Sequence, residues 1–287
     1  MWNFKIIIKM KKATILCVLF FIATITYAQS VDYKIIKNNP ESLSERYLNL
    51  ELLGADVAFD FNEAPVFVGV NGFYKINEKI KAEALLRLHL FNIVGSGVGL
   101  HMEGGVFTPL KKYYKNKDVK VIVGSTYGSI SDKYGNNTRS GTTTNYLTAQ
   151  GKYLNQLGVR GGVYLRNSVY YESLTSSEID VNYTTMGVYL GAEKITQAFV
   201  EALVGKRSYY GQGRTKIYLD ALILPVQSIE NDVVSADDVI GYRAGMQWQQ
   251  KPVKGNWFKP VYNAEIGSRP FTGFYIQVSI GISLFDF

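Results

Sequence analysis

Cysteine and long apolar runs are what this sequence most clearly lacks. Its single cysteine, Cys17, lies in an N-terminal segment that we expect to be removed, so the mature chain would have no disulfide bond and no thiol chemistry. No run of about 18 apolar residues follows that segment, so no helix is expected to span a membrane in the mature chain. Proline is scarce, with 7 residues, whereas glycine (27) and tyrosine (21) are plentiful, a mixture that favours many strands and tight turns.

The formal charge of +7 is concentrated at the N-terminus. Residues 1–28 hold four lysines and no acid, so 27 basic residues stand against 24 acidic ones in the remainder. Those basic residues are scattered among acids and form no cluster on one face, which argues against a nucleic-acid partner.

A secretory signal peptide is predicted for residues 1–28. Lysines precede an apolar run at 13–25, and the small residue Ala28 completes a cleavage site. Met10 is an alternative start of translation, and a retained membrane anchor is an alternative reading of the apolar run. We expect residues 29–48 to be a periplasmic lead-in and residues 49–287 to form one domain.

The last sixteen residues carry a long period-2 pattern. One row holds Phe274, Ile276, Val278, Ile280, Ile282 and Leu284, and the other holds Gly273, Tyr275, Gln277, Ser279, Gly281 and Ser283. One face of this predicted strand therefore carries apolar side chains, and the other carries small or polar ones. The alternation lasts for about eleven residues, which is the length that a tilted strand needs to cross a bilayer.

The same theme repeats along the chain and predicts an all-β fold, a transmembrane antiparallel up-and-down β-barrel. Firm strands are expected near 50–61, 66–76, 80–91, 98–106, 119–123, 157–165, 185–195, 197–206, 213–224, 239–250, 259–268 and 273–284, with a doubtful one at 146–155. A closed antiparallel barrel normally has an even number of strands. We therefore expect 12 strands, with 14 and then 10 as alternatives. Residues 108–118, 131–144, 173–183 and 225–238 are expected to be connections or loops.

The candidate site is the set of polar side chains on the inward rows. It comprises Lys81, Glu83, Arg87, His89, His101, Glu103, Arg160, Arg166, Glu193, Lys216, Asp220 and Arg243. Rings of charge inside a barrel tune the selectivity of a pore, so one hypothesis is a narrow pore with a mild preference for anions. The alternative is that these charges neutralise one another inside a filled barrel.

The two histidines of the chain both fall on inward rows. If the hairpin turns about Gly95, His89 lies opposite His101 and Arg87 lies opposite Glu103, with directly opposed Cβ atoms about 4.5–5.5 Å apart. Such a group could form an acid–base or metal site. The competing interpretation is a hydrogen-bonded, salt-bridged interior, and we predict neither a catalytic residue nor a bound metal.

Enzymatic signatures are otherwise missing from the sequence. No Ser is seen beside either histidine, no Gly-x-Ser-x-Gly motif occurs, and no phosphate-binding loop is present. Gly95-Ser96-Gly97-Val98-Gly99 is not followed by a predicted helix and is not a nucleotide-binding fingerprint. The sequence therefore predicts no enzyme and no cofactor.

Several features resemble the outer-membrane β-barrel proteins common in Bacteroidota. They are Tyr27-Ala28-Gln29, the run from Gly158 to Tyr164, and a last strand that ends in Phe287. The resemblance implies an outer-membrane location, contact with its lipid, and recognition of the last strand by the barrel assembly machinery. In that group the terminal aromatic residue shares the phase of the outward row, whereas Phe287 is out of phase with Leu284. A bulge near Phe285-Asp286 would restore the phase.

Three functional classes remain open from the sequence. The first is a narrow, porin-like pore or a transporter for small solutes. The second is a non-conducting binding, secretion-associated or structural barrel whose loops at 131–144 and 225–238 meet a partner. The third is a barrel lipid hydrolase that depends on His89.

Overall fold

A computed structural model describes residues 32–43, 45–59, 63–94, 97–131, 138–174, 177–229, 238–251 and 259–286. The segment expected to be a signal peptide, 1–28, and the terminal Phe287 lie outside this description. No helix in the described ranges is long and apolar enough to cross a bilayer.

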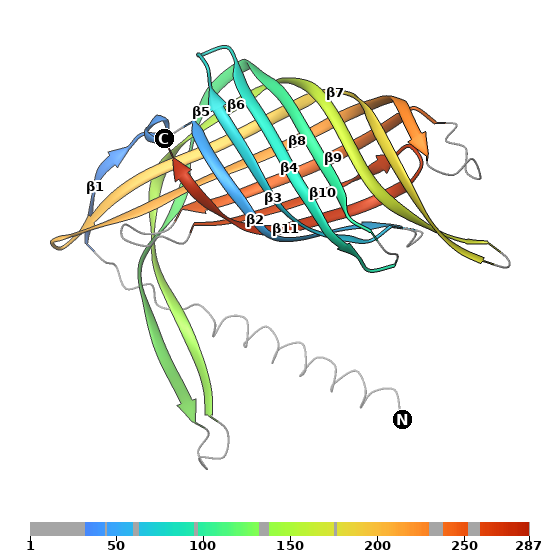
Figure 1. Ribbon diagram of the computed structural model, residues 1–287. Helices are drawn as coiled ribbons and strands as arrows, with labels where there is room; N and C mark the ends of the chain where they lie inside the picture. The colour runs from blue at the N-terminus through green and yellow to red at the C-terminus, as the bar shows by residue number, and fades with distance from the viewer. Residues whose placement is uncertain are drawn as a thin grey trace, which may run out of the picture. The chain divides into compact units, whose positions relative to one another are not determined.

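The described chain is almost entirely antiparallel strand (Figure 1). In chain order the elements are β1 (Tyr33–Asn38), the 3-10 helix η1 (Pro40–Ser42), β2 (Arg46–Ala58), β3 (Pro65–Lys75), β4 (Lys81–Asn92), β5 (Gly99–Ser131), β6 (Thr138–Leu174), β7 (Ser177–Val204), β8 (Arg207–Ile229), β9 (Ile240–Lys251), β10 (Pro260–Arg269) and β11 (Gly273–Asp286). The strands are tilted across the barrel wall.

The sheet closes on itself through β2 and β11. Each of the strands β2 to β11 pairs with its sequence neighbours, and the register of β11 with β2 runs from Tyr275↔Ala58 to Asp286↔Tyr47. The described residues thus form an up-and-down barrel of ten strands, with β1 outside it on the edge of β7. Closure leaves no open edge around the barrel wall, which an isolated sheet cannot achieve.

Alternation within β4 shows why these sequences form a barrel wall. Leu86, Leu88 and Leu90 are exposed on the outer side, whereas Arg87 and His89 between them are buried. The pattern is the reverse of a soluble strand, with apolar side chains outside and polar side chains inside, as in a barrel that faces lipid.

The expected count of 12 strands is not confirmed, because two pairs of predicted strands are each one strand. The predicted strands 98–106 and 119–123 are both parts of β5, and the predicted strands 185–195 and 197–206 are both parts of β7. The doubtful strand 146–155 and the firm one after it likewise form β6. Ten was the last of the three counts that the sequence left open.

A bulge explains why β5 was predicted as two strands. The pairing of β5 with β6 shifts between Pro109 and Lys111, so Leu110 is extra and the inward and outward rows exchange phase there. Residues 108–118 were therefore wrongly expected to be a connection. Strand pairing also reaches into the other three predicted loops, up to Ser131↔Thr138, to Leu174↔Ser177 and to Tyr183↔Ile229.

The two ends of the barrel differ. We call the end at which β2 begins and β11 ends the proximal end, and the opposite one the distal end. The β5–β6 hairpin continues past the proximal end as a two-stranded ribbon (Figure 1). β1 lies at the same end, where it pairs with Val200–Val204 of β7 after β6 has left that edge.

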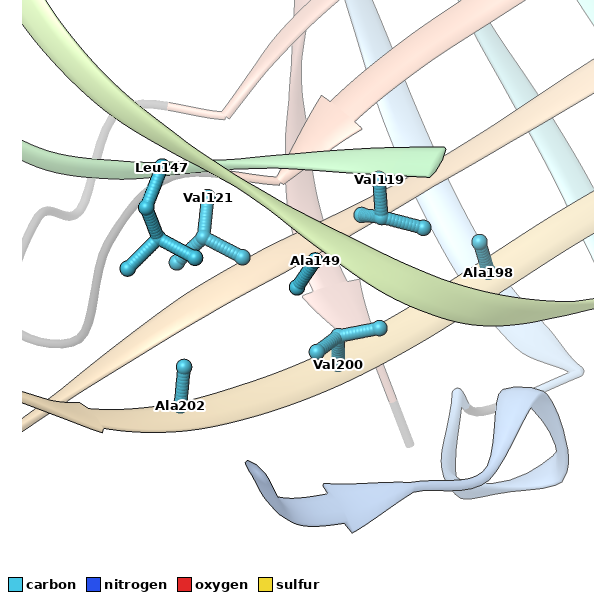
Figure 2. Packing of buried hydrophobic residues seen from close by; sticks show 7 residues of the cluster. All are labelled: Val119, Val121, Leu147, Ala149, Ala198, Val200 and Ala202. Atoms are coloured by element: carbon cyan, nitrogen blue, oxygen red, sulfur yellow. The ribbon is translucent and has the colours of Figure 1, made fainter. Parts of the chain in front are cut away.

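An apolar cluster fixes the root of this hairpin. Figure 2 shows the hairpin crossing β7, with side chains from both packed between them. The cluster contains Val119, Val121, Leu147, Ala149, Ala198, Val200 and Ala202, and Ile35 of β1 and Tyr209 of β8 pack against it. Val200 lies in the same outward row of β7 as Val188 and Leu190, which are 47% and 66% exposed, but Val200 is fully buried because the hairpin covers it.

The last strand, β11, contains a β-bulge near its end, as expected from the phase of Phe287. Its pairing with β2 shifts between Ser283 and Phe285, so Leu284 is an extra residue at that point. The bulge lies one residue before the place at which a phase correction was expected.

Candidate functional site

The barrel interior is the candidate site, and the twelve residues singled out from the sequence all lie inside it. Eleven of them are buried, and the side chain of Lys216 is 12% exposed. They come from six strands, β4 to β9, and the alternation of each strand turns them inward.

Opposite charges are balanced in the interior. Among the described residues, the buried or nearly buried cationic side chains there are eight, namely Lys81, Arg87, Arg160, Arg166, Arg214, Lys216, Arg243 and Arg269. Eight carboxylates accompany them, namely Glu51, Asp56, Glu63, Glu83, Glu103, Glu193, Asp220 and Glu265. Burial of a charge is costly unless it is paired and hydrogen-bonded, so the balance favours mutual neutralisation and gives no net preference for anions.

Arg243 of β9 organises the centre of the barrel. Its Nη2 donates to Glu103 at 2.8 Å and its Nε donates to Asp220 at 2.8 Å. His101 lies beside this group, with its Nε2 2.9 Å from the Glu103 carboxylate. The guanidinium lies between carboxylates from strands on different sides of the barrel, so it cross-links the wall through the interior.

A second group surrounds Arg160 of β6. Its guanidinium is 3.2 Å from Glu83 and 3.5 Å from Glu193, and Lys216 reaches the same two carboxylates at 2.5 and 3.1 Å. The Tyr218 ring lies 4.3 Å from the Arg160 guanidinium carbon, which adds a cation–π contact.

Nearer to β11, Arg87 forms a forked pair with Glu51. Its Nε and Nη2 donate to the two carboxylate oxygens at 2.7 and 3.1 Å, and its Nη1 donates to Gln277 at 2.8 Å. Two parallel bonds of this kind fix both side chains in one plane.

The distal end is closed by another buried cluster. Arg166 donates to Asp56 at 2.9 Å and to Glu63 at 2.5 Å, and Arg269 donates to Asp56 at 2.8 Å. Tyr183 donates to Glu63 at 2.8 Å. Glu63 lies just before β3, so these contacts tie the start of β3 to Arg166 and Tyr183 inside the barrel.

The proximal end is covered by the chain before β2. Glu45 accepts hydrogen bonds of 2.7 Å from both Lys81 and Gln156, and it lies 3.0 Å from Lys75. Burial by itself raises the pKa of the Glu45 carboxyl, but the hydrogen bonds from Lys81 and Gln156 outweigh it and lower the pKa to about 2. Pro40 of η1 is buried and accepts a bond from Gln197 at 3.1 Å, so η1 also sits over this mouth.

Between these clusters the interior contains a small polar cavity of about 70 Å³. Glu51, Arg87, Arg160, Lys216 and Glu265 are among its lining residues. Sites for small molecules are usually ~300–1,000 Å³, so this space suits a few water molecules and no larger solute.

The histidines do not face each other. Arg87, not His89, pairs with His101, and His89 pairs with Gly99, so the hairpin is displaced by two residues from the predicted register. Leu85 rather than Arg87 lies opposite Glu103. The predicted His89–His101 pair is therefore wrong, and no three His, Cys, Asp or Glu side chains in the described ranges come together as a metal site.

A serine lies beside His89, which sequence reasoning missed. Ser168 Oγ is 3.4 Å from His89 Nδ1 and donates a short hydrogen bond to Glu63. Both side chains are buried, at 2% and 3% exposure, and the serine hydroxyl points to the carboxylate instead of the imidazole. This geometry gives neither an activated nucleophile nor access for a substrate.

Other interior residues were not among the twelve candidates. They are Glu51, Asp56, Glu63, Arg214, Glu265 and Arg269, together with the interior tyrosines Tyr164, Tyr189, Tyr218 and Tyr275. The alternation of β2 and β10 places Asp56 and Glu265 inward, because each lies between outward apolar residues. Glu63 lies in a connection, where no periodicity marks the inward side.

Comparison with known proteins gives no relative: no protein-family model, no curated protein and no solved structure matches the chain.

Proposed function

We propose that the protein is an outer-membrane β-barrel with a closed interior, which acts by binding a partner at its proximal end and does not conduct solutes. The observation that carries this proposal is the interior itself. Charged clusters occupy the centre and both ends, and the cavity between them holds about 70 Å³. A separate cavity of about 390 Å³ lies at the proximal end, beside Glu45 and Gln197. Barrels of about eight strands are filled by side chains, whereas aqueous channels belong to barrels of about 16–18 strands.

The outer surface supports a place in a membrane. Large apolar side chains project from successive strands, among them Leu88 of β4, Leu190 of β7, Leu219 of β8 and Val278 of β11, which are 49–66% exposed. Soluble monomers rarely expose a contiguous apolar surface of this extent. A closed barrel with an apolar outside and a polar inside fits the outer membrane that the sequence predicts.

The other two classes from the sequence have less support. A pore with a preference for anions needs a continuous lumen and a surplus of cations. The described residues enclose only a small central cavity, and the buried charges among them balance. A lipid hydrolase needs an accessible nucleophile, and the one serine found beside a histidine, Ser168, is buried.

Single-channel recording of the refolded mature protein in a planar bilayer tests the proposal. We expect correct insertion, shown by a heat-modifiable band on a gel, without ion-conducting steps. Glu45→Gln serves as a second sample, because it loosens the proximal cover while leaving the central clusters intact, and it should also stay silent. Stable, ion-selective steps in the wild-type protein would contradict the proposal and restore the pore hypothesis.

A further inference from the structure

The β5–β6 hairpin carries an unpaired strand edge outside the barrel wall. β4 pairs with β5 only from Gly99 to Phe107, and beyond that point no described strand lies along the same edge of β5. In an antiparallel strand every second residue turns its N–H and C=O toward each edge. The stretch Lys111–Gly124 is about 45 Å long at ~3.4 Å per residue, so it presents a long row of backbone donors and acceptors.

The opposite edge of the same hairpin is already used. Tyr33 donates to the carbonyl of Thr148 at 3.2 Å. Asn38 donates to the carbonyl of Gln150 at 3.1 Å and accepts from the backbone N–H of Lys152 at 2.7 Å. The molecule thus covers the β6 edge with its own β1 region. No described strand pairs with the β5 edge beyond Phe107, where Glu41 of η1 contacts the side chains of Lys112 and Tyr114.

The hairpin is held firmly enough to serve as a template. Val119 and Val121 pack over Gly211 of β8 and against Val200 of β7, and this apolar cluster lies beyond the lipid-facing row that ends at Leu110. A two-stranded ribbon alone is marginally stable in water. Its anchored root therefore fixes the free edge in an extended form at low entropic cost to a binding partner.

The charge of this edge selects its partner. Lys111, Lys112, Lys115, Lys117 and Lys120 line the stretch, and Asp118 is its one acid. Lys112 is paired with Glu41 at 2.9 Å, whereas Lys111 and Lys115 lie over the ring of Tyr113. Lysines on an edge also discourage a second copy from pairing, because like charges would lie opposite each other.

We infer that the β5 edge, Lys111–Gly124, binds an extended acidic segment of another protein by strand addition. Main-chain hydrogen bonds supply the affinity and the lysines supply the selectivity, as in other cases of β-augmentation. This inference names the partner class of the proximal end and so rests on the proposed function.

A pair of blocked peptides tests the inference on the full mature protein in phosphatidylcholine nanodiscs. The probe is a labelled peptide of about ten residues in which Glu alternates with Val and Thr. The control peptide keeps every Glu but carries Pro in place of Val, so it has the same charge and lacks N–H groups needed for pairing. Anisotropy titration should show the probe binding at least about tenfold more tightly than the control peptide.

Two further measurements locate the binding. The double variant Lys115→Gln, Lys117→Gln should weaken binding of the probe about tenfold, whereas Lys206→Gln, an exposed lysine in the β7–β8 turn, should leave it unchanged. Hydrogen exchange should slow in Lys111–Gly124 when the probe is bound and stay unchanged in Gly99–Phe107, which β4 already pairs.

Equal binding of both peptides, or competition by phosphatidylglycerol vesicles without protection of the β5 amides, would overturn strand addition and leave a basic surface for anionic lipid. Absence of binding by the probe would overturn the inference as well. Neither result bears on conductance, so a silent barrel that fails to bind the probe refutes only this inference, and a conducting barrel that binds it refutes only the proposed function.

Discussion

At the scale of single residues, the interior is built from charges that need one another. Arg166 is fully buried, and its guanidinium lies between Asp56 and Glu63. In a dry interior the attraction between such charges offsets the loss of their hydration only when each has a partner. The alternation of β4 to β9 was sufficient to place the twelve candidate residues inside. The ion-pair partner of each candidate residue could not be predicted from this alternation, because the pairs depend on the register between strands far apart in sequence.

Replacing Arg166 with Met should destabilise the barrel strongly. The substitution leaves Glu63 buried without its cation and leaves Asp56 with Arg269 alone, and breaking a buried pair in this way costs about 3–5 kcal/mol of unfolding free energy. Urea unfolding in detergent micelles, followed by tryptophan fluorescence, measures the loss. Lys206→Met is the matched control on the exposed β7–β8 turn and should change stability by less than about 0.5 kcal/mol.

The double variant Arg166→Met, Glu63→Gln should recover part of that stability, because Asp56 keeps Arg269 as its partner and Glu63 no longer carries an unpaired charge. A loss of less than about 1 kcal/mol in the single variant would show that the cluster is hydrated and weakly coupled.

Glu45 gives the proximal cover a defined pH dependence. Its pKa falls from an ordinary value of 4.5 to about 2 in the folded protein. Because the folded-state pKa is the lower one, the stabilisation from this carboxylate is complete above about pH 4.5 and is lost as the pH falls toward 2. The unfolding free energy of the wild-type protein should therefore exceed that of Glu45→Gln by a constant amount at neutral pH, and the difference should shrink below pH 4.5. A difference that stays constant down to pH 2 would contradict this assignment.

At the scale of elements, the period-2 pattern of a strand depends on which of its faces are exposed and which are buried. It therefore does not by itself show where a long strand ends. It located β3, β4, β9, β10 and β11 closely, because each has an exposed apolar row on one side and the polar interior on the other along most of its length. It divided β5 at the bulge of Leu110, where the two rows exchange phase. It also divided β7 near Ala198, where the outer row changes from exposed to covered by the hairpin and both faces become buried.

Gly211 of β8 allows that cover to form. A Cβ at this position would lie 2.8 Å from methyl groups of both Val119 and Val121 and 3.0 Å from the carbonyl of Lys120. Gly211→Val should therefore push the hairpin away from β8 without opening the barrel. Trypsin cleavage at the lysines of β5 is the readout, and we expect it to accelerate at least about tenfold as local opening becomes easier.

Gly124→Val is the matched control for this prediction. A Cβ at Gly124 meets no atom within 4 Å, so the variant should be cleaved at the wild-type rate. Equal cleavage of both variants would mean that the apolar cluster does not hold the hairpin.

At the scale of the whole molecule, the barrel separates a charged interior from an apolar outside. Trp248 of β9 is on the outside, 42% exposed and stacked on Tyr262 with ring centroids 5.4 Å apart. The fold class and the outward rows were predictable from the sequence, since a period of two that repeats over many strands of bilayer-crossing length is typical of a membrane barrel. The closed interior was not, because it results from long side chains meeting across the barrel.

Brominated lipids can test the outward position of Trp248. In a Trp257→Phe background Trp248 is the one tryptophan of the expected mature chain, and we expect its fluorescence to be quenched in vesicles with brominated acyl chains. Moving the tryptophan to β1, with Trp248→Phe and Tyr33→Trp, places it outside the apolar surface and should abolish the quenching. Fluorescence of Trp248 that is insensitive to bromination would contradict membrane insertion.

Pairing of β2 with β11 has a consequence for the order in which the chain folds. Residues as distant in sequence as Ala58 and Tyr275 must meet before the wall is complete, and β1 must wait for both β6 and β7 before it can join the edge at Val204. Long-range closures of this kind carry the largest entropic cost and come late in folding. A nascent chain would thus remain an open, curved sheet until its final strand is available. A chaperone that carries it to the bilayer has to cover two unpaired strand edges until then.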